Sequence, residues 1–290
     1  MMIFVAGATG AVGRLLVPLL LDAGHEVVGA SRTETGADRI RAAGARAVRV
    51  DALDADGLRA AVAAAAPDAI VHQLTDLSTA DGAANNRLRH EGTRNLVDAA
   101  KAAGVERIVA QSIAWAYAPG PGPAGESVPL DPTDELPRAR IVGGARALED
   151  QVSELPEAVV LRYGILYGPG TWYAPGGAVA AALAGAPEAR FLGSLTADDS
   201  VSSFVHVADA AEAALQALTW PPGAYNIVDD APAPSRAWLP ALAKALGTPA
   251  PPPAEGALPW ARGASNTRAR ALGWRPTHPT WRAGFAAQGD

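Results

Sequence analysis

The sequence predicts an α/β protein with a doubly wound parallel sheet and a smaller C-terminal substrate lobe. Three features of the 290 residues predict it. Short apolar runs alternate with segments of helical periodicity through the first half of the chain, which is typical of a parallel sheet covered by helices. A glycine-rich loop, residues 7–13, directly follows the first apolar run. After Gly168 the pattern changes to short segments rich in Gly, Pro and aromatic residues.

The first strand–helix–strand unit is the clearest local signal. Residues 3–6 form a short apolar run of the kind that becomes a buried strand. Leucine and valine recur at helical spacing across 11–23, and Gly24 ends that helix. The apolar run 27–30 is the second expected strand, and it closes a unit of the type that builds parallel sheets.

The later elements repeat this alternation. Helices are expected at 35–43, 54–65, 85–103 and 140–149. Strands are expected at 47–50, 69–72, 107–110 and 159–161. Because such strands connect through helical crossovers of one hand, the expected sheet is parallel and wound in both directions.

The change of character after Gly168 predicts two interlocked domains. We expect residues 1–165 and 201–219 to form a dinucleotide-binding domain, and residues 166–200 and 220–290 to form the substrate lobe. The Pro- and Gly-rich stretch 119–132 is expected as a surface loop near the carboxyl end of the sheet, where open α/β folds bind ligands.

Composition narrows the class of partner. The net charge of -6 argues against a nucleic-acid surface. The absence of cysteine excludes disulfides and thiolate chemistry. No apolar stretch has the roughly 18 residues that a bilayer needs, and the first residues do not resemble a signal peptide. We therefore expect a cytoplasmic protein with a small-molecule substrate, without membrane or nucleic-acid partners, and we leave a homodimer open.

The glycine loop predicts a bound dinucleotide on a Rossmann-type sheet. Glycines let the chain turn sharply from strand to helix, and they let the backbone approach a pyrophosphate at the helix amino end. A glycine turn without a ligand is the alternative, but the strand–turn–helix context favours the cofactor. The loop residues expected to bind it are Gly7, Thr9, Gly10, Ala11, Val12 and Gly13.

The residues after the second and third strands point to NADP(H), with NAD(H) as the alternative. Ser31 and Arg32 stand where an acidic residue would bind the ribose hydroxyls of NAD, and an arginine there suits a 2′-phosphate. A solvent-exposed Arg32 without a ligand is the competing interpretation. Asp51 ends the third strand and is expected at the adenine, or else as a helix cap.

Several segments together resemble the extended short-chain dehydrogenase/reductase family, the NAD-dependent epimerase/dehydratase group. The resemblance covers nearly the whole chain. The segments that carry it are residues 7–13, Asp51-Ala52-Leu53, His72-Gln73-Leu74-Thr75, residues 91–96, residues 162–170, residues 204–209 and residues 272–276. The resemblance implies a Rossmann-type sheet and adds Ala52, Leu74 and Thr75 to the cofactor-binding residues.

The family's catalytic residues are a serine or threonine, a tyrosine, and a lysine four residues after the tyrosine. In this chain the resemblance places Ile141 at the tyrosine position and Ala145 at the lysine position. Ser112 is the nearest hydroxyl after the fifth strand. No tyrosine lies between Tyr117 and Tyr163, so no shift of alignment restores the pair.

The candidate substitutes are few. Ser112, Tyr117 and Tyr163 are the expected catalytic hydroxyls, and Trp115, Trp172 and Tyr173 the expected aromatic wall of a pocket for a flat substrate. For these tyrosines and tryptophans, packing is the competing interpretation. No metal site is expected, because His72, His90 and His206 lack ligand spacing.

An oxidoreductase without a positioned acid needs an activated substrate. Quinone-like, conjugated or iminium acceptors take a hydride with less proton assistance. The sequence therefore predicts an NAD(P)-dependent oxidoreductase that reduces such a small molecule. A non-redox cyclase or isomerase on the same fold, and an NADP(H)-binding redox sensor, remain alternatives because fold does not fix function.

Overall fold

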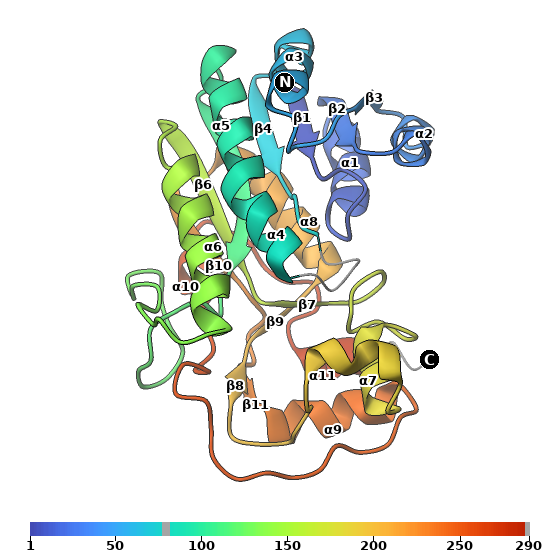
Figure 1. Ribbon diagram of the computed structural model, residues 1–290, viewed down its shortest axis with the longest axis vertical. Helices are drawn as coiled ribbons and strands as arrows, with labels where there is room; N and C mark the ends of the chain where they lie inside the picture. The colour runs from blue at the N-terminus through green and yellow to red at the C-terminus, as the bar shows by residue number, and fades with distance from the viewer. Residues whose placement is uncertain (77–81, 288–290) are drawn as a thin grey trace. The chain divides into compact units, whose positions relative to one another are not determined.

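A computed structural model describes residues 1–76 and 82–287 of the chain. Its main feature is a seven-stranded sheet with the strand order β10-β6-β5-β4-β1-β2-β3 (Figure 1). The central strand β1 (Met2–Ala6) pairs in parallel with β2 (Glu26–Ser31) and with β4 (Ala69–His72). The strands expected from the sequence are confirmed, and the sheet is doubly wound from β1 outward in both directions.

The remaining strands extend this sheet to its two edges. They are β3 (Arg46–Arg49), β5 (Arg107–Ile113), β6 (Glu157–Tyr163) and β10 (Gly223–Ile227). The edge strand β10 differs from the sequence expectation, which placed 220–290 in the substrate lobe. Tyr225, Asn226 and Ile227 are all buried, so burial of this short segment against the sheet decided its place.

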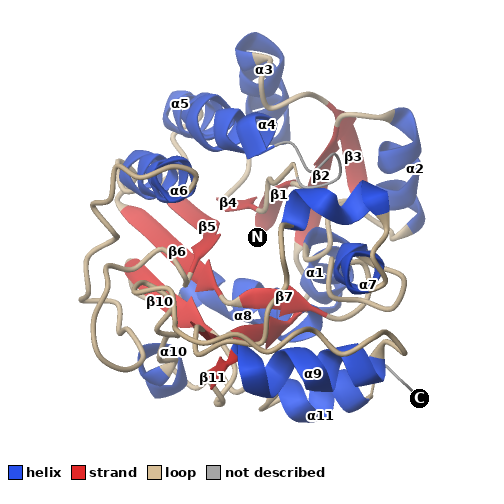
Figure 2. Ribbon diagram, turned by 60° about the horizontal axis from the view of Figure 1, so that its bottom comes forward, coloured by secondary structure: helices blue, strands red, loops and turns tan. Residues whose placement is uncertain are grey.

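Helices cover both faces of these strands. Figures 1 and 2 show α3 (Ala55–Ala65), α5 (Thr93–Ala102) and α6 (Arg138–Val152) side by side on one face, with α1 (Gly13–Asp22) and α2 (Glu34–Ala42) on the other. The predicted long helix 85–103 is divided into α4 (Gly82–Arg87), a π-helical turn (Leu88–Gly92) and α5. Phe4, Ile70 and Ile108 are fully buried in the core between sheet and helices.

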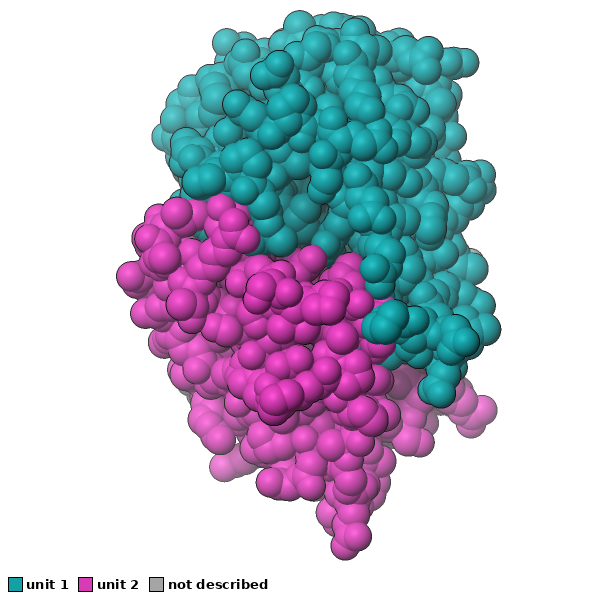
Figure 3. Space-filling model, turned by 90° about the vertical axis from the view of Figure 1, so that its left-hand side faces the viewer, with its two compact units in different colours: residues 1–112, 132–161, 211–224 teal, residues 113–131, 162–210, 225–290 magenta. Residues whose placement is uncertain are grey.

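The chain forms two compact units, coloured separately in Figure 3. Unit 1 comprises Met1–Ser112, Pro132–Leu161 and Ala211–Ala224, and unit 2 comprises Ile113–Asp131, Arg162–Ala210 and Tyr225–Asp290. Unlike the prediction, residues 162–165 and 201–210 belong to unit 2, and residues 220–224 belong to unit 1. The longest difference is at 113–131, which belongs to unit 2. The backbone of this segment bonds within that unit, from Ala124 N to Gly263 O at 3.0 Å.

Unit 2 has its own small sheets and an aromatic core. The strands β7 (Ile165–Tyr167) and β9 (Phe204–His206) pair in parallel, and β8 (Val201–Ser202) pairs with β11 (Ala233–Pro234). The helices are α7 (Ala178–Leu183), α9 (Ser235–Ala245), α10 (Thr267–Ala271) and α11 (Trp281–Ala286). The helix α8 (Val207–Gln216) begins in unit 2 and ends in unit 1.

Across the described ranges, 1–76 and 82–287, every helix is too short or too polar to cross a lipid bilayer.

The packing of α11 on Tyr167 gives a test of the unit 2 core. A methyl group added at Gly284 would lie closer than 3.0 Å to the Tyr167 ring, which is fully buried. Gly284→Ala should therefore lower the free energy of unfolding by about 1–3 kcal/mol in denaturant titrations, as overpacking does. Gly143→Ala in α6 is the control, because no atom lies within 4 Å of the added methyl. It should raise stability by about 0.5–1 kcal/mol. Equal effects of the two substitutions would contradict this packing.

Candidate active site

The glycine loop between β1 and α1 packs directly against backbone atoms of its neighbours. Gly7 has φ +90°, and a Cβ on it would lie closer than 3.0 Å to the carbonyl of Gln73. A Cβ on Gly13 would meet the carbonyl of Gly7 equally closely. The Gly10 N–H donates to Gly7 O at 3.1 Å. The amino end of α1 has no side-chain cap, and a close glycine turn that leads into a helix amino end fits a phosphate ligand.

A hollow of about 290 Å³ opens beside this loop in unit 1. It is lined by Ala8, Thr9, Arg14, Val17, Arg39, Ile40 and Ala43. Thr9 was expected at the cofactor, whereas Arg14 and Arg39 were not singled out from the sequence. Two guanidinium groups beside a phosphate-binding loop make this hollow suited to a second anionic group. The position of Arg39 on the helix after β2 was the only sequence signal for it.

The predicted pair Ser31 and Arg32 is only partly available. The Ser31 hydroxyl donates to Thr33 O at 3.0 Å and accepts from Thr33 N at 3.2 Å, so it stabilises the turn into α2. Arg32 is 55% exposed and donates to the Asp76 carboxylate at 3.1 Å. A surface ion pair of this kind contributes about 1 kcal/mol or less, so the guanidinium is free to turn to a stronger anionic partner.

Asp51 and Ala52, which were expected at the cofactor, form hydrogen bonds to neighbouring backbone and side-chain groups. Asp51 accepts from Leu53 N at 2.9 Å, whereas Asp54 caps α3 by accepting from Gly57 N at 3.0 Å. The interpretation of Asp51 as the helix cap is therefore wrong, because Asp54 occupies the cap position. Ala52 is buried, and its carbonyl accepts from Asn95 Nδ2 at 2.9 Å. That bond connects two of the segments that carried the family resemblance.

His72, at the end of β4, shapes the chain that passes the glycine loop. Its Nδ1 accepts from Leu74 N at 3.2 Å, so Nε2 carries the proton and donates to the Thr93 hydroxyl at 2.9 Å. Complete burial, and then the charge of Arg89, lowers the pKa of His72 to about 4. The Leu74 carbonyl accepts from Gln111 at 2.9 Å, and Thr75 is exposed.

Ser112, the expected catalytic serine, is bonded to a carboxylate that sequence reasoning did not assign. Its hydroxyl donates to Glu149 Oε1 at 2.6 Å, and both side chains are buried. Glu149 lies two turns after Ile141 on α6, and Ala145 between them is 1% exposed. The sequence of α6 contains neither tyrosine nor lysine. Its polar contributions at this point are Glu149 and the carbonyl of Ile141, which accepts from Arg89 at 3.4 Å.

Tyr117 is placed in a buried polar network of unit 2. Its hydroxyl lies 2.6 Å from Asn226 Oδ1 and accepts from Arg162 Nη1 at 2.9 Å. Asn226 in turn donates to the carbonyls of Ala124 and Ser265. Burial raises the pKa of Tyr117, and the positive charge of Arg162 only partly opposes it. A catalytic role for this phenol stays a prediction, and it requires that the bond to Asn226 be exchanged for one to substrate.

Tyr163 and Trp115 also lie in unit 2. Tyr163 is 2% exposed, and its hydroxyl donates to Ala210 O at the long distance of 3.4 Å. Trp115 is half-buried. A catalytic role for the Tyr163 phenol, like one for Tyr117, stays a prediction.

Trp172 and Tyr173 pack against other rings of unit 2. The Trp172 ring meets Phe191 edge to face at 5.2 Å, and Tyr173 meets Phe204 at 5.9 Å and Trp238 at 6.2 Å between centroids. Burial raises the pKa of Tyr173 to about 12. These contacts agree with the packing interpretation, and both side chains keep partial exposure, so a pocket-lining role stays a prediction.

A cluster of His206, Asp209 and His278 could offer ligands to a metal ion. Its hydrogen bonds show a structural role. Asp209 accepts from Thr277 N at 2.8 Å, from His278 N at 3.0 Å and from His278 Nδ1 at 3.1 Å. His206 Nδ1 accepts from Ala208 N, and the two imidazoles stack 3.7 Å apart. Burial, and then His278, lowers the pKa of His206 to about 4.

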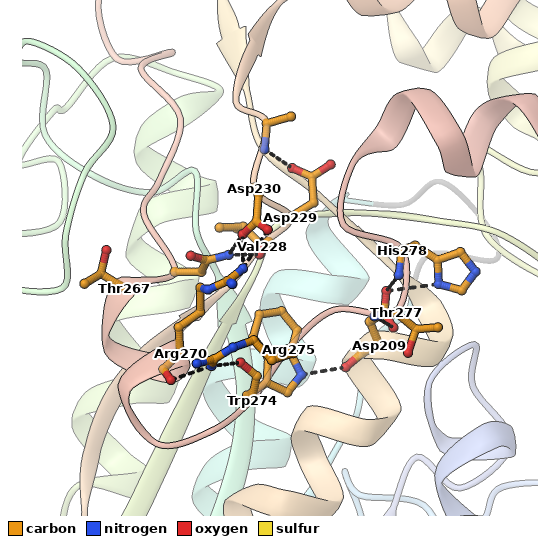
Figure 4. Close-up of polar contacts among 12 residues, drawn as sticks. Asp209, Val228, Asp229, Asp230, Thr267, Arg270, Trp274, Arg275, Thr277 and His278 are labelled. Atoms are coloured by element: carbon orange, nitrogen blue, oxygen red, sulfur yellow. Dashed lines mark hydrogen bonds and ion pairs between the residues drawn. The ribbon is translucent and has the colours of Figure 1, made fainter.

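Figure 4 shows how these bonds attach the last segment of the chain within unit 2. Asp209 holds the Thr277 end, and Trp274 Nε1 donates to the Asp209 carbonyl at 3.3 Å. At the other end, Arg270 binds both carboxylate oxygens of Asp230 at 2.7 and 2.6 Å. Residues 204–209 and 272–276, two segments of the family resemblance, are therefore in direct contact.

The family model described as NAD dependent epimerase/dehydratase matches residues 3–228. The chain belongs to this family. Over 313 aligned positions it is 44% identical to a Streptomyces protein described as 3-diazoavenalumate denitrifying reductase, with 99% of this chain and 100% of that protein covered. The family assignment confirms the resemblance, and it makes the protein an NAD(P)-dependent oxidoreductase that acts on a small molecule.

Solved structures of the family agree with this fold. UDP-glucose 4-epimerase of Thermus thermophilus in complex with NAD is 26% identical, with a TM-score of 0.76 over 100% of this chain and 98% of that chain. UDP-glucose 4-epimerase of Thermotoga maritima with UDP-glucose is 19% identical, with a TM-score of 0.76 over 100% and 97% of the two chains. The residues of the glycine loop fit the dinucleotide that the family binds, because a helix end without a side-chain cap and the close backbone turn are both present.

The buried His72 predicts a specific acid sensitivity. Its folded-state pKa is lowered, so the neutral ring stabilises the fold above about pH 6.5, and that contribution is lost as the pH falls toward about 4. The loss amounts to about 3 kcal/mol when complete. Denaturant unfolding near neutral pH and at about pH 4.5 should show a smaller pH effect in His72→Gln than in the unmodified protein. The exposed His90→Gln serves as the control and should keep the original pH dependence. A pH effect as large in His72→Gln as in the unmodified protein would contradict this account.

Proposed function

We propose that this protein is an NADPH-dependent reductase of activated small molecules, and that a diazo compound is the first substrate to test. The observation that carries the proposal is helix α6, which has Ile141 and Ala145 where the family's proton donor and cation are expected and which contains no tyrosine or lysine. A reaction that needs no positioned phenol is therefore favoured over epimerisation of a sugar. The relative described as a diazo-compound reductase supports that choice.

Diazo chemistry fits a site without an acid. NADPH, when bound, supplies a hydride. An arenediazonium ion that accepts a hydride at its terminal nitrogen becomes a neutral diazene. The diazene loses N₂ when its carbon–nitrogen bond breaks and the hydrogen from its N–H group becomes bonded to the ring carbon. The cation is neutralised by the hydride itself, so no alkoxide develops and no external proton is consumed.

The chain's own residues then bind and orient. The amino end of α1 receives the cofactor pyrophosphate through the loop Gly7 to Gly13. Arg39 and Arg14, with Arg32 turned from Asp76, would hold the 2′-phosphate in the hollow beside Thr9. Ser112, whose hydroxyl donates to Glu149, can accept a hydrogen bond from the substrate. Trp115, Tyr117, Tyr163, Trp172 and Tyr173 remain the proposed substrate-side residues of unit 2.

Turnover of a diazonium derivative of hydroxycinnamate tests the reaction. The purified protein should oxidise NADPH and release N₂ in equal amounts, measured by absorbance and by mass spectrometry of the gas. UDP-glucose should show neither epimerisation nor NADPH oxidation. Conversion of the diazonium probe to an isomer without NADPH consumption would identify the non-redox alternative. Efficient epimerisation of UDP-glucose would show that another residue supplies the proton, and it would refute the proposal.

Cofactor preference tests the arginine assignments. NADPH should bind at least about tenfold more tightly than NADH, since charge-assisted contacts to a phosphate contribute about 1.5–3 kcal/mol. Arg39→Ala and Arg32→Ala should each weaken NADPH binding in isothermal titration calorimetry and leave NADH binding unchanged. Arg59→Ala, on the exposed side of α3, is the control and should change neither. If only Arg39→Ala has an effect, the hollow and not Arg32 receives the phosphate. Equal affinities for the two cofactors would overturn both assignments.

A further inference from the structure

The side chain of Arg89 reaches helix α6 at the turn that carries Ile141 and Ala145. It leaves the π-helical turn Leu88–Gly92, and its Nη1 donates to Ile141 O at 3.4 Å. A Cβ added at Gly144 would overlap Asn86 Oδ1 and would lie 3.3 Å from the Cδ of Arg89. The glycine therefore leaves space for Asn86, with Arg89 beside it. Irregular π-helical turns of this kind are frequent at functional sites.

The charge of Arg89 is poorly compensated. Within residues 1–76 and 82–287, no ion pair to Arg89 is formed, and the single long bond to Ile141 uses one of its five N–H donors. Its neighbours in unit 1 are paired: Arg87 with Glu91, Arg94 with Asp98 and Glu154, and Arg107 with Glu157. Burial lowers the pKa of Arg89 to about 10, and the carboxylate of Glu149 only partly opposes this. The guanidinium remains charged at neutral pH and has donors left for a ligand.

A second polar atom beside it also lacks a partner. Asn86 Oδ1 is buried and accepts no hydrogen bond from any residue that the structure describes. It lies against Gly144 on the same side of α6 as Arg89. Open donors next to an open acceptor match a ligand that presents both an oxygen anion and a hydroxyl or water. Arg89 bonds to α6 at Ile141, and α6 also carries Glu149, which accepts from Ser112. Ser112 is the residue before the last one of β5, near the carboxyl edge where open sheets bind ligands.

We propose that Arg89 is the residue that selects the substrate, by binding the carboxylate of a flat, conjugated acid. The inference rests on the proposed function and specifies the substrate class of that same site. A guanidinium cannot favourably face the positive diazonium end of such a molecule, so it binds the opposite, anionic end. The reducible group is thereby directed away from Arg89. The substrate class is then aromatic or polyunsaturated carboxylates that carry a cationic or conjugated acceptor.

Binding of unreactive probes tests this without turnover. Hydroxycinnamate and its neutral amide are titrated into the protein saturated with NADP⁺, with intrinsic tryptophan fluorescence as the readout. The carboxylate should bind about tenfold or more tightly than the amide. Arg89→Gln should remove that preference by weakening only the carboxylate. Arg89→Lys should retain part of it, because a point charge replaces the planar fork. Arg87→Gln is the control, because Arg87 lies two residues before Arg89 and pairs with Glu91. This variant should bind both probes as the unmodified protein does.

The outcomes separate this inference from the proposed function. Equal affinity of the unmodified protein for acid and amide, or an unchanged preference in Arg89→Gln, would overturn the role of Arg89. Weaker NADP⁺ binding in Arg89→Gln with unchanged probe affinity would overturn it too, since the cation would then face the cofactor. A normal unfolding midpoint identifies variants that fold. Loss of diazonium reduction with the carboxylate preference intact would refute the proposed function and leave the role of Arg89 supported.

Discussion

The arrangement of unit 1 depends on one steric constraint: the glycine loop packs directly against backbone atoms and leaves no space for side chains. Gly7 lies against the Gln73 carbonyl and Gly13 against the carbonyl of Gly7, at distances that admit no Cβ. These contacts join β1, the first turn of α1 and the chain after β4, whose path His72 fixes through Leu74. Because the backbones of these three elements are in contact, the amino end of α1 is held at the carboxyl edge of the sheet, where phosphates bind.

The face of α6 determines which chemistry this edge can carry. A tyrosine and a lysine one turn apart would bring a proton and a positive charge to the same place. In this chain the turn instead presents Ile141, Ala145 and a glycine pair, and Arg89 enters from the neighbouring helix layer. The charge is present and the transferable proton is not. Under the proposed function, such a site would bind the anionic end of the substrate and would accept a reaction in which the hydride alone neutralises the acceptor.

Unit 2 shows why isolated aromatic residues are ambiguous in a sequence. Tyr117 follows β5, as an active-site phenol would, and yet its hydroxyl binds Asn226 and Arg162 from distant segments. Trp172 and Tyr173 join rings contributed by other elements, β9 and α9 among them. Asp209 on α8 fixes the backbone of the last segment by accepting from Thr277 N and His278 N. These partners come from other elements or lie far away along the chain, so local pattern carries no information about them.

The sequence by itself determined the strands and helices of the Rossmann-type sheet, the loop at Gly7 to Gly13 and the family, because these depend on local periodicity and on backbone space at particular glycines. It also determined that α6 has no tyrosine or lysine. Only the tertiary structure decided that Gly223–Ile227 joins the sheet edge and that Glu149 holds Ser112. It also decided that Arg39 lines the hollow beside Thr9 and that Arg89 reaches the carbonyl of Ile141. The physical reason is that charge compensation and burial depend on side chains brought together from separate elements. Whether an arginine forms an ion pair therefore cannot be predicted from its position in the sequence.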